Sequence, residues 1–131
     1  METRSLYNSL GVCNFTAVPF FTGALPFSKL VEAVTAITGW ETSLWELLRV
    51  GERANVMARV FNVRQGIGPE EDCLFRPMHE PLVSGPYKGE CIDPVAFRDA
   101  VHLYYEMSGW DDQGKPTRGK LVDMGLEWLI A

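Results

Sequence analysis

Three cysteines, two histidines and a run of acidic residues are the side chains best suited to chemistry in this 131-residue sequence. His79 follows Cys73 by six positions and precedes Glu80, so these residues form the one conceivable local metal site. Their spacing does not fit, because structural zinc sites use closely spaced pairs of cysteine and histidine. The odd cysteine number without a Cys-x-x-Cys pair argues against a disulfide framework and favours a reducing compartment, which we expect to be the cytoplasm.

A second candidate is the segment Gly109–Lys115, which matches G-x-x-x-x-G-K, the beginning of a phosphate-binding loop. The next residue is Pro116, so the hydroxyl that would bind Mg²⁺ is missing. The segment also follows a predicted helix, whereas a phosphate-binding loop follows a strand. We therefore interpret it as a turn.

The remaining ionisable residues are interpreted as solvent-facing. The acidic run 70–72 is expected to be a solvated turn. His102 lies four residues from both Arg98 and Glu106, which is typical of an exposed row along a helix. No Ser-His-Asp or Cys-His arrangement follows from order or spacing, so the sequence by itself shows no complete active site.

A long helix over about residues 43–64 is predicted to be the central element. Ser43 and Glu46 have the spacing of a capping box, and Gly66 is a natural left-handed stop. One helical face is apolar, with residues three and four apart: Leu44, Leu47, Leu48, Gly51, Ala54, Ala58 and Phe61.

The same helix carries polar residues around the rest of its surface: Arg53, Asn55, Arg59, Asn62 and Arg64. They can be a solvated face. Alternatively, some of them tie neighbouring loops to the helix, since one guanidinium can serve several carbonyls or a carboxylate at once. The sequence leaves both interpretations open.

The other elements are predicted to be helices over 28–38, 94–108 and 117–124, each ended by glycine or begun by a capping residue. Residues 67–92 are rich in glycine and proline without periodicity, so we expect a long irregular loop that inserts Leu74, Phe75, Met78 and Leu82 between the helices. Residues 1–27 fit no period. The predicted fold class is therefore all-α, a small single domain over 1–131 built on one central helix.

Composition limits the partners. Apolar residues make up 47% of the chain and the net charge is −5, which indicates a globular protein and argues against nucleic acid and anionic membrane surfaces. No apolar run approaches the roughly 20 residues of a membrane span, and the N-terminus lacks a hydrophobic targeting core.

Four motifs, in the same order and spacing, resemble those of the aldehyde:ferredoxin oxidoreductases. Residues 51–66 resemble G-E-R followed by R-x-F-N-x-R-x-G, and residues 104–126 resemble Y-Y-x-x-x-G-W-D-x-x-G-x-P-T-x-x-x-L-x-x-x-G-L. Residues 71–75 resemble D-D-x-L-P, with Phe75 in place of the proline, and residues 8–13 resemble D-x-x-G-L-C. The resemblance covers nearly the whole chain.

The resemblance implies the C-terminal part of an oxidoreductase that converts aldehydes to carboxylic acids. That enzyme uses a tungsten or molybdenum bis-pterin and a 4Fe–4S cluster, and passes electrons to ferredoxin. The D-x-x-G-L-C run implies cofactor-binding roles for Asn8, Gly11, Val12 and Cys13, with Cys13 as the fourth cluster ligand. Asn8 stands where the family has an aspartate that binds a pterin. The other cluster cysteines and the acid/base residues lie upstream in the family.

Two hypotheses follow from this resemblance. The chain can be a C-terminal domain that is inactive alone and works with upstream cofactor-binding domains or a subunit of the same enzyme. Alternatively, it is a helical interaction module that has lost the cofactor role. Under either hypothesis, the apolar side chains of the N-terminal segment (Leu10, Val12, Phe15, Phe20 and Phe21) need a cover, supplied by self-association or by packing onto the domain.

Overall fold

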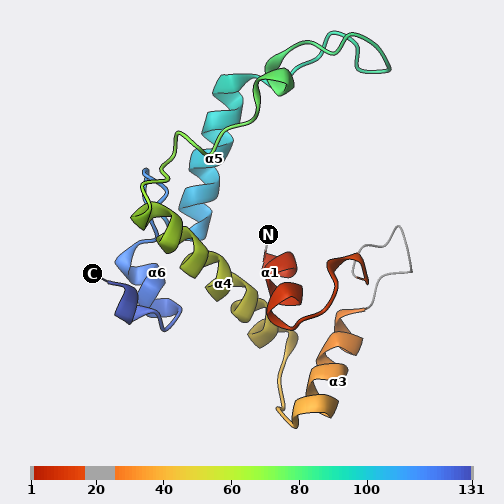
Figure 1. The fold of residues 1–131 in the computed structure, drawn as a ribbon, viewed down its shortest axis with the longest axis vertical. Helices are drawn as coiled ribbons and strands as arrows, with labels where there is room; N and C mark the ends of the chain where they lie inside the picture. The colour runs from red at the N-terminus through yellow and green to blue at the C-terminus, as the bar shows by residue number, and fades with distance from the viewer. Residues whose placement is uncertain (1, 17–25, 131) are drawn as a thin grey trace. The chain divides into compact units, whose positions relative to one another are not determined.

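The structure, a computed structural model, describes residues 2–16 and 26–130, and its regular secondary structure there consists of helices. Figure 1 shows the helices α1 (Glu2–Ser9), α3 (Phe27–Thr38), α4 (Leu44–Arg64), α5 (Pro94–Ser108) and α6 (Arg118–Asp123). Three short 3₁₀ turns accompany them: η1 (Asn14–Thr16) between α1 and α3, η2 (Arg76–His79) between α4 and α5, and η3 (Glu127–Leu129) after α6. The described residues contain no strand, only an isolated bridge between Trp110 and Pro116. The predicted all-α class is confirmed, with α4 as its longest helix.

The helix ends follow the capping chemistry that the sequence indicates. At the start of α4 the Ser43 amide donates to the Glu46 carboxylate over 2.8 Å, and the Glu46 amide donates to the Ser43 hydroxyl, which completes the capping box. The Asp93 side chain accepts from the amide of Val95 at the start of α5. The Thr117 hydroxyl accepts from the amide of Lys120 at the start of α6. The predicted helix bounds are therefore correct to within one or two residues.

The chain divides into two compact units, Met1–Ala58 and Arg59–Ala131, and the boundary falls within α4. The first unit has a core of fully buried side chains: Leu6, Tyr7, Leu30 and Leu47. Leu6 and Tyr7 come from α1, a helix that the sequence did not predict, because eight residues are too few to establish a period. The single domain over 1–131 stays a prediction.

The predicted apolar face of α4 is correct in its first half and wrong in its second. Leu47 and Gly51 are buried and Leu48 packs against the core of the first unit. Ala58 is exposed and Phe61 is 63% exposed, whereas Arg59 and Val60 are buried. A helix can change its buried face along its length when its two halves pack against different neighbours. One apolar stripe with three- and four-residue spacing, followed over the whole helix, does not detect that change.

The second unit has its own core of apolar side chains: Val60, Tyr105, Leu121, Met124, Leu126 and Leu129. The sequence suggested that the long loop between α4 and α5 inserts its apolar residues between the helices. The structure shows that most of them are not inserted. Leu74 is half-buried, but Phe75, Met78 and Leu82 are exposed. No helix in the described part of the chain is long and apolar enough to cross a membrane.

Candidate functional site

Arg59 is the one buried charged residue in the described part of the second unit, with only 6% of its surface exposed. It projects from α4, on the side shared with the buried Val60. A buried guanidinium is stable only when its donors are matched by acceptors, because an unpaired charge is costly to remove from water. The partners of Arg59 therefore define the site.

Those partners come from three other segments, and we call Arg59, Asp72, Tyr105 and Gly114 together the arginine cluster. Arg59 Nη2 lies 2.6 Å from the Asp72 carboxylate, and Arg59 Nε donates to the Gly114 carbonyl over 2.7 Å. The Tyr105 hydroxyl accepts from Arg59 Nη2 over 3.3 Å and donates to the same Asp72 carboxylate. The guanidinium carbon also lies 5.2 Å from the ring centre of Trp110.

This arrangement decides between the two interpretations of the polar residues on α4. Arg59 ties a loop, a helix and a turn to α4, Arg64 donates to the carbonyl of Leu129, and Asn55 accepts from Ser5. The interpretation as ties to neighbouring segments is correct for these three residues. The expectation of a solvated acidic turn is wrong for Asp72, which is two-thirds covered.

The candidate phosphate loop over residues 109–115 is the turn that presents Gly114 to Arg59. The Asp111 carboxylate accepts from the amides of Gln113 and Lys115, over 3.0 and 2.8 Å. In a phosphate-binding loop, such amides donate hydrogen bonds to the phosphate. Here they donate to a carboxylate of the chain itself. The interpretation as a turn is confirmed.

Both the backbone conformation and the close packing at position 114 require glycine. Its φ of +66° lies in the left-handed region, and a Cβ added there would meet Arg59 Nη2 at 2.1 Å and Tyr105 Cζ at 2.8 Å. Only glycine lets the backbone come close enough for its carbonyl to accept from Arg59. The glycine of the G-x-P-T motif therefore has a direct physical role.

Burial and, after it, the hydrogen bond to the Asp72 carboxylate and its negative charge raise the pKa of Tyr105 to about 12, against a smaller opposing effect of Arg59. The phenol therefore stays protonated at neutral pH and acts as a hydrogen-bond donor to Asp72. With every charged group matched and the phenol held neutral, the arginine cluster is suited to holding segments together and not to proton transfer.

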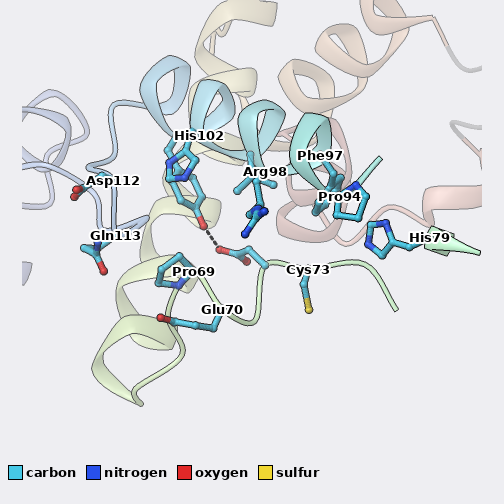
Figure 2. Close-up of a pocket in the computed structure, with 13 residues that line it drawn as sticks. Pro69, Glu70, Cys73, His79, Pro94, Phe97, Arg98, His102, Asp112 and Gln113 are labelled. Atoms are coloured by element: carbon cyan, nitrogen blue, oxygen red, sulfur yellow. Dashed lines mark hydrogen bonds between the residues drawn. The ribbon is translucent and has the colours of Figure 1, made fainter. Parts of the chain in front are cut away.

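A pocket of about 530 Å³ lies next to the arginine cluster, entirely within the second unit. Figure 2 shows it between α5, which contributes Phe97, Arg98 and His102, and the loop that carries Glu70 and Cys73. Asp72 and Tyr105 also line it, so the arginine cluster forms part of its wall. The pocket mixes acidic, basic and apolar side chains, and no single ligand chemistry follows from them.

The Cys73, His79 and Glu80 combination does not form a metal site. His79 Nδ1 lies 2.7 Å from the carbonyl of Ile92, and its ring packs edge-on against Phe97. Among the described residues, no group of three or more His, Cys, Asp or Glu side chains could hold a metal ion. His102 is exposed, as expected, and packs edge-on against Tyr105.

The four residues that the resemblance marked lie together in the first unit, around the end of α1. Gly11 has a φ of +67° and follows the helix as a left-handed cap. The amide of Val12 donates to the carbonyl of Tyr7 over 2.9 Å, and the Val12 side chain packs against the core. Asn8 Oδ1 accepts from Asn14 Nδ2 over 2.6 Å, and Cys13 is exposed directly after this turn.

This turn explains the spacing of Asn8, Gly11 and Cys13. Glycine permits the left-handed residue, the next residue anchors the turn to the core, and the cysteine follows outside it. The donor set fits one ligand of an iron–sulfur cluster, since Cys13 offers one exposed thiol. It does not fit a complete cluster, because among the described residues no group of three or more Cys, His, Asp or Glu side chains could hold a metal ion.

Comparison with known proteins identifies the family. Residues 1–126 match the family model described as aldehyde ferredoxin oxidoreductase, domains 2 and 3. The chain belongs to the aldehyde ferredoxin oxidoreductase family. The predicted family is thereby confirmed.

Curated relatives agree with this assignment, and the chain matches only part of their length. It is 34% identical over 98% of its length to a tungsten-containing aldehyde ferredoxin oxidoreductase of Pyrococcus abyssi, and 32% identical over 95% to that of Pyrococcus furiosus. In each case it spans only 20% of the relative. A relative with a different name, the WOR-like subunit of an aliphatic sulfonate oxidoreductase of P. furiosus, is 29% identical.

A solved structure supports the fold. The active site complex BamBC of benzoyl coenzyme A reductase matches 95% of the chain with a TM-score of 0.70 at 20% identity, over 18% of the matched chain. At that identity the likeness concerns the fold alone. The helical architecture therefore occurs in proteins with different names, and the fold alone does not fix a substrate.

Proposed function

We propose that the chain is the C-terminal part of a tungsten- or molybdenum-dependent oxidoreductase that converts aldehydes to carboxylic acids and is inactive without the rest of the enzyme. The observation that carries the proposal is the match of residues 1–126 to the family, together with relatives named as tungsten-containing aldehyde ferredoxin oxidoreductases. The chain spans a fifth of those relatives, so the whole enzyme's activity is inferred from them.

In this proposal, Cys13 is one ligand of a 4Fe–4S cluster, and three further thiolates come from the upstream polypeptide. The turn around Gly11 and Val12 holds the Cys13 thiol outside the core of the first unit, which is where a ligand to an external group has to lie. Asn8 lies beside that turn and can contact the pterin through its amide, which offers donors as well as an acceptor. When bound, the metal–pterin and cluster supply the redox chemistry, and this chain supplies ligands and fixed geometry.

The proposed partners follow from the same reasoning. Upstream domains, in the same polypeptide or a separate subunit, bring the remaining ligands and the metal–pterin, and ferredoxin receives electrons from the complete enzyme. The exposed thiols of Cys13, Cys73 and Cys91 suit a reducing compartment such as the cytoplasm.

A chimera tests the proposal. We would replace the matched fifth of the P. abyssi relative with this chain, and measure tungsten, iron and aldehyde-dependent reduction of a viologen dye. The isolated chain should contain neither metal and oxidise no aldehyde, whereas the chimera should contain both and be active. Tungsten in stoichiometric amount in the isolated chain, or a metal-loaded chimera that oxidises no aldehyde, would contradict the proposal.

Cysteine variants of the chimera test the assigned ligand. Cys13→Ser should lower the iron content, because a cluster loses a thiolate ligand. Cys73→Ser and Cys91→Ser are matched controls, since both residues are exposed like Cys13 and should leave the iron content unchanged. Equal iron content in all three variants would remove Cys13 from the cluster.

A second function, a helical interaction module without cofactor role, is favoured by one observation. Asn8 stands at the expected pterin-binding position and its Oδ1 already accepts from Asn14. If this alternative holds, the Cys13→Ser chimera keeps its iron and the upstream polypeptide binds its cofactors without the chain.

A further inference from the structure

The segment from the last residues of η2 to the start of α5 forms an exposed arm. We call residues 78–92 the arm. In Figure 1 it lies beyond the N-terminal end of α5, within the second unit. Every residue from position 80 to 96 is exposed, including Leu82, Val83 and Tyr87 with exposed fractions of 52%, 86% and 66%.

The arm holds its shape through its own backbone. The amide of Leu82 donates to the carbonyl of Glu90 over 3.0 Å, and the amide of Gly89 donates to the carbonyl of Leu82 over 2.8 Å. Gly85 and Gly89 both have φ of +90°, which allows the chain to reverse direction twice within the arm. A loop that needed only to connect η2 with α5 would not require these bonds.

The base of the arm is fastened to the second unit. The amide of Ile92 donates to the carbonyl of Met78 over 3.1 Å, and the ring of His79 contacts the carbonyl of Ile92 and packs against Phe97 of α5. The arm is therefore closed at its base and anchored to α5, while the apolar side chains at its tip are exposed. Exposed apolar side chains gathered on a preformed element are typical of an interaction surface.

We propose that the arm docks into an apolar groove of the polypeptide that makes up the other four-fifths of the relatives. The chain spans 20% of those relatives, so a large body of protein is available to cover the arm. The arm contains two glutamates and one lysine, too little charge to select a strongly charged partner, so burial of Leu82, Val83 and Tyr87 supplies the contact. Because the arm is preformed, little conformational entropy is lost on docking.

This inference rests on the proposed partnership with upstream domains, and does not depend on the aldehyde chemistry. The probe is the P. abyssi relative shortened by the fifth that the chain matches. We would measure its affinity for the isolated chain by calorimetry, and the exchange of the arm's amide hydrogens in the same mixture. Binding with slowed exchange over residues 80–91 is the expected result.

Matched variants of the arm make the test specific. A Val83→Asp and Tyr87→Asp double variant should bind at least about tenfold more weakly, because docking would bury unpaired carboxylates. The Val83→Leu and Tyr87→Phe double variant keeps the arm apolar and should bind like the parent. Since both positions are exposed, neither variant should shift the melting temperature of the isolated chain by more than about 2 °C.

The possible outcomes separate this inference from the proposed function. If the aspartate variant binds as tightly as the parent, the partnership stands and the arm is not its contact. If the parent itself does not bind, the docking inference is overturned, and the chimera decides the proposed function separately. If the aspartate variant instead abolishes self-association of the isolated chain, the arm is an interface between copies and the inference is wrong.

Discussion

Arg59 contacts four residues through polar or ring interactions, and only an arginine could make all of them at this position, because its guanidinium is planar, always charged and multiply donating. Its position could have been predicted more closely. Val56 and Val60 are both buried, and Arg59 lies three residues after the first and next to the second. A second apolar stripe through these valines would have placed Arg59 at the edge of the buried face.

The close approach of Gly114 to Arg59 gives the first prediction. Gly114→Ala should lower the free energy of unfolding by roughly 2–4 kcal/mol, through left-handed backbone strain and overpacking against Arg59 and Tyr105. Gly39→Ala is the matched control, because Gly39 has a similar φ of +72° and open space around its Cβ position. It should lose only about 1–2 kcal/mol in urea denaturation. Equal losses would mean that the close contact is unimportant.

The buried ion pair gives the second prediction. Arg59→Met should destabilise the chain by about 3 kcal/mol, the lower end of the range for a broken buried pair, because Asp72 is still 32% exposed. Arg53→Met on the same helix should cost no more than about 0.5 kcal/mol, since Arg53 is exposed. Denaturant unfolding of both variants measures the difference. A similar cost for the two would show that the arginine cluster contributes little stability.

The raised pKa of Tyr105 predicts a loss of stability in alkali. The folded protein holds the phenol proton more tightly than the unfolded chain, so this contribution is complete below pH 10 and lost as pH rises through about 12. The free energy of unfolding should fall by at most about 2.7 kcal/mol over that interval. Tyr105→Phe should remove this fall, whereas Tyr87→Phe, at an exposed position, should retain it. Identical pH profiles for the two variants would contradict the assignment.

At the scale of elements, the sequence predicted most where the signals are local. The capping boxes and glycine stops depend on residues within one turn, so α3, α4, α5 and α6 were placed nearly correctly. Whether the loop residues Phe75 and Leu82 are buried depends on packing between distant segments, and that expectation was wrong. The turn at Gly11 is also indicated locally, by the glycine itself. The role of Cys13 as a cluster ligand, in contrast, was predicted only from the family resemblance.

The capping box of α4 gives a prediction with a pH dependence. Hydrogen bonds from the Ser43 hydroxyl and amide lower the pKa of Glu46, so their stabilising effect is present above the ordinary value of 4.5 and lost as pH falls through the lowered pKa. Ser43→Ala should bring the Glu46 pKa back toward that value in an NMR titration. Ser28→Ala is the control, because α3 has no side-chain cap at its start. An unchanged Glu46 titration in Ser43→Ala would refute the capping role.

At the scale of the whole molecule, the burial of large apolar side chains is incomplete. Each unit has a core, yet large apolar side chains such as Phe15, Val83 and Trp128 are mostly exposed. Leu10 and Val12 pack onto the core of the first unit, so packing onto the domain is the correct alternative for these two. Phe20 and Phe21 lie outside the described residues. The sequence could not predict which of these apolar side chains are buried, because their burial depends on packing between segments that are distant in the chain.

The exposure of Cys13 gives the last prediction, which relates the labelling rate of this thiol to the oligomeric state of the chain. In the isolated chain Cys13 should react rapidly with an aromatic disulfide reagent, because its thiol is exposed and follows the turn at Gly11. Light scattering on the same sample reports the mass, which should rise with concentration if Phe15, 67% exposed, is covered by a second copy. In that case labelling of Cys13 slows as the mass rises, and Phe15→Ser keeps labelling fast at every concentration.

Cys13→Ser identifies which of the three labelled thiols is affected. A slowly labelled Cys13 in a stable monomer would mean that the segment is covered by the domain itself, and the proposal that a cofactor-bearing partner meets it there would fail.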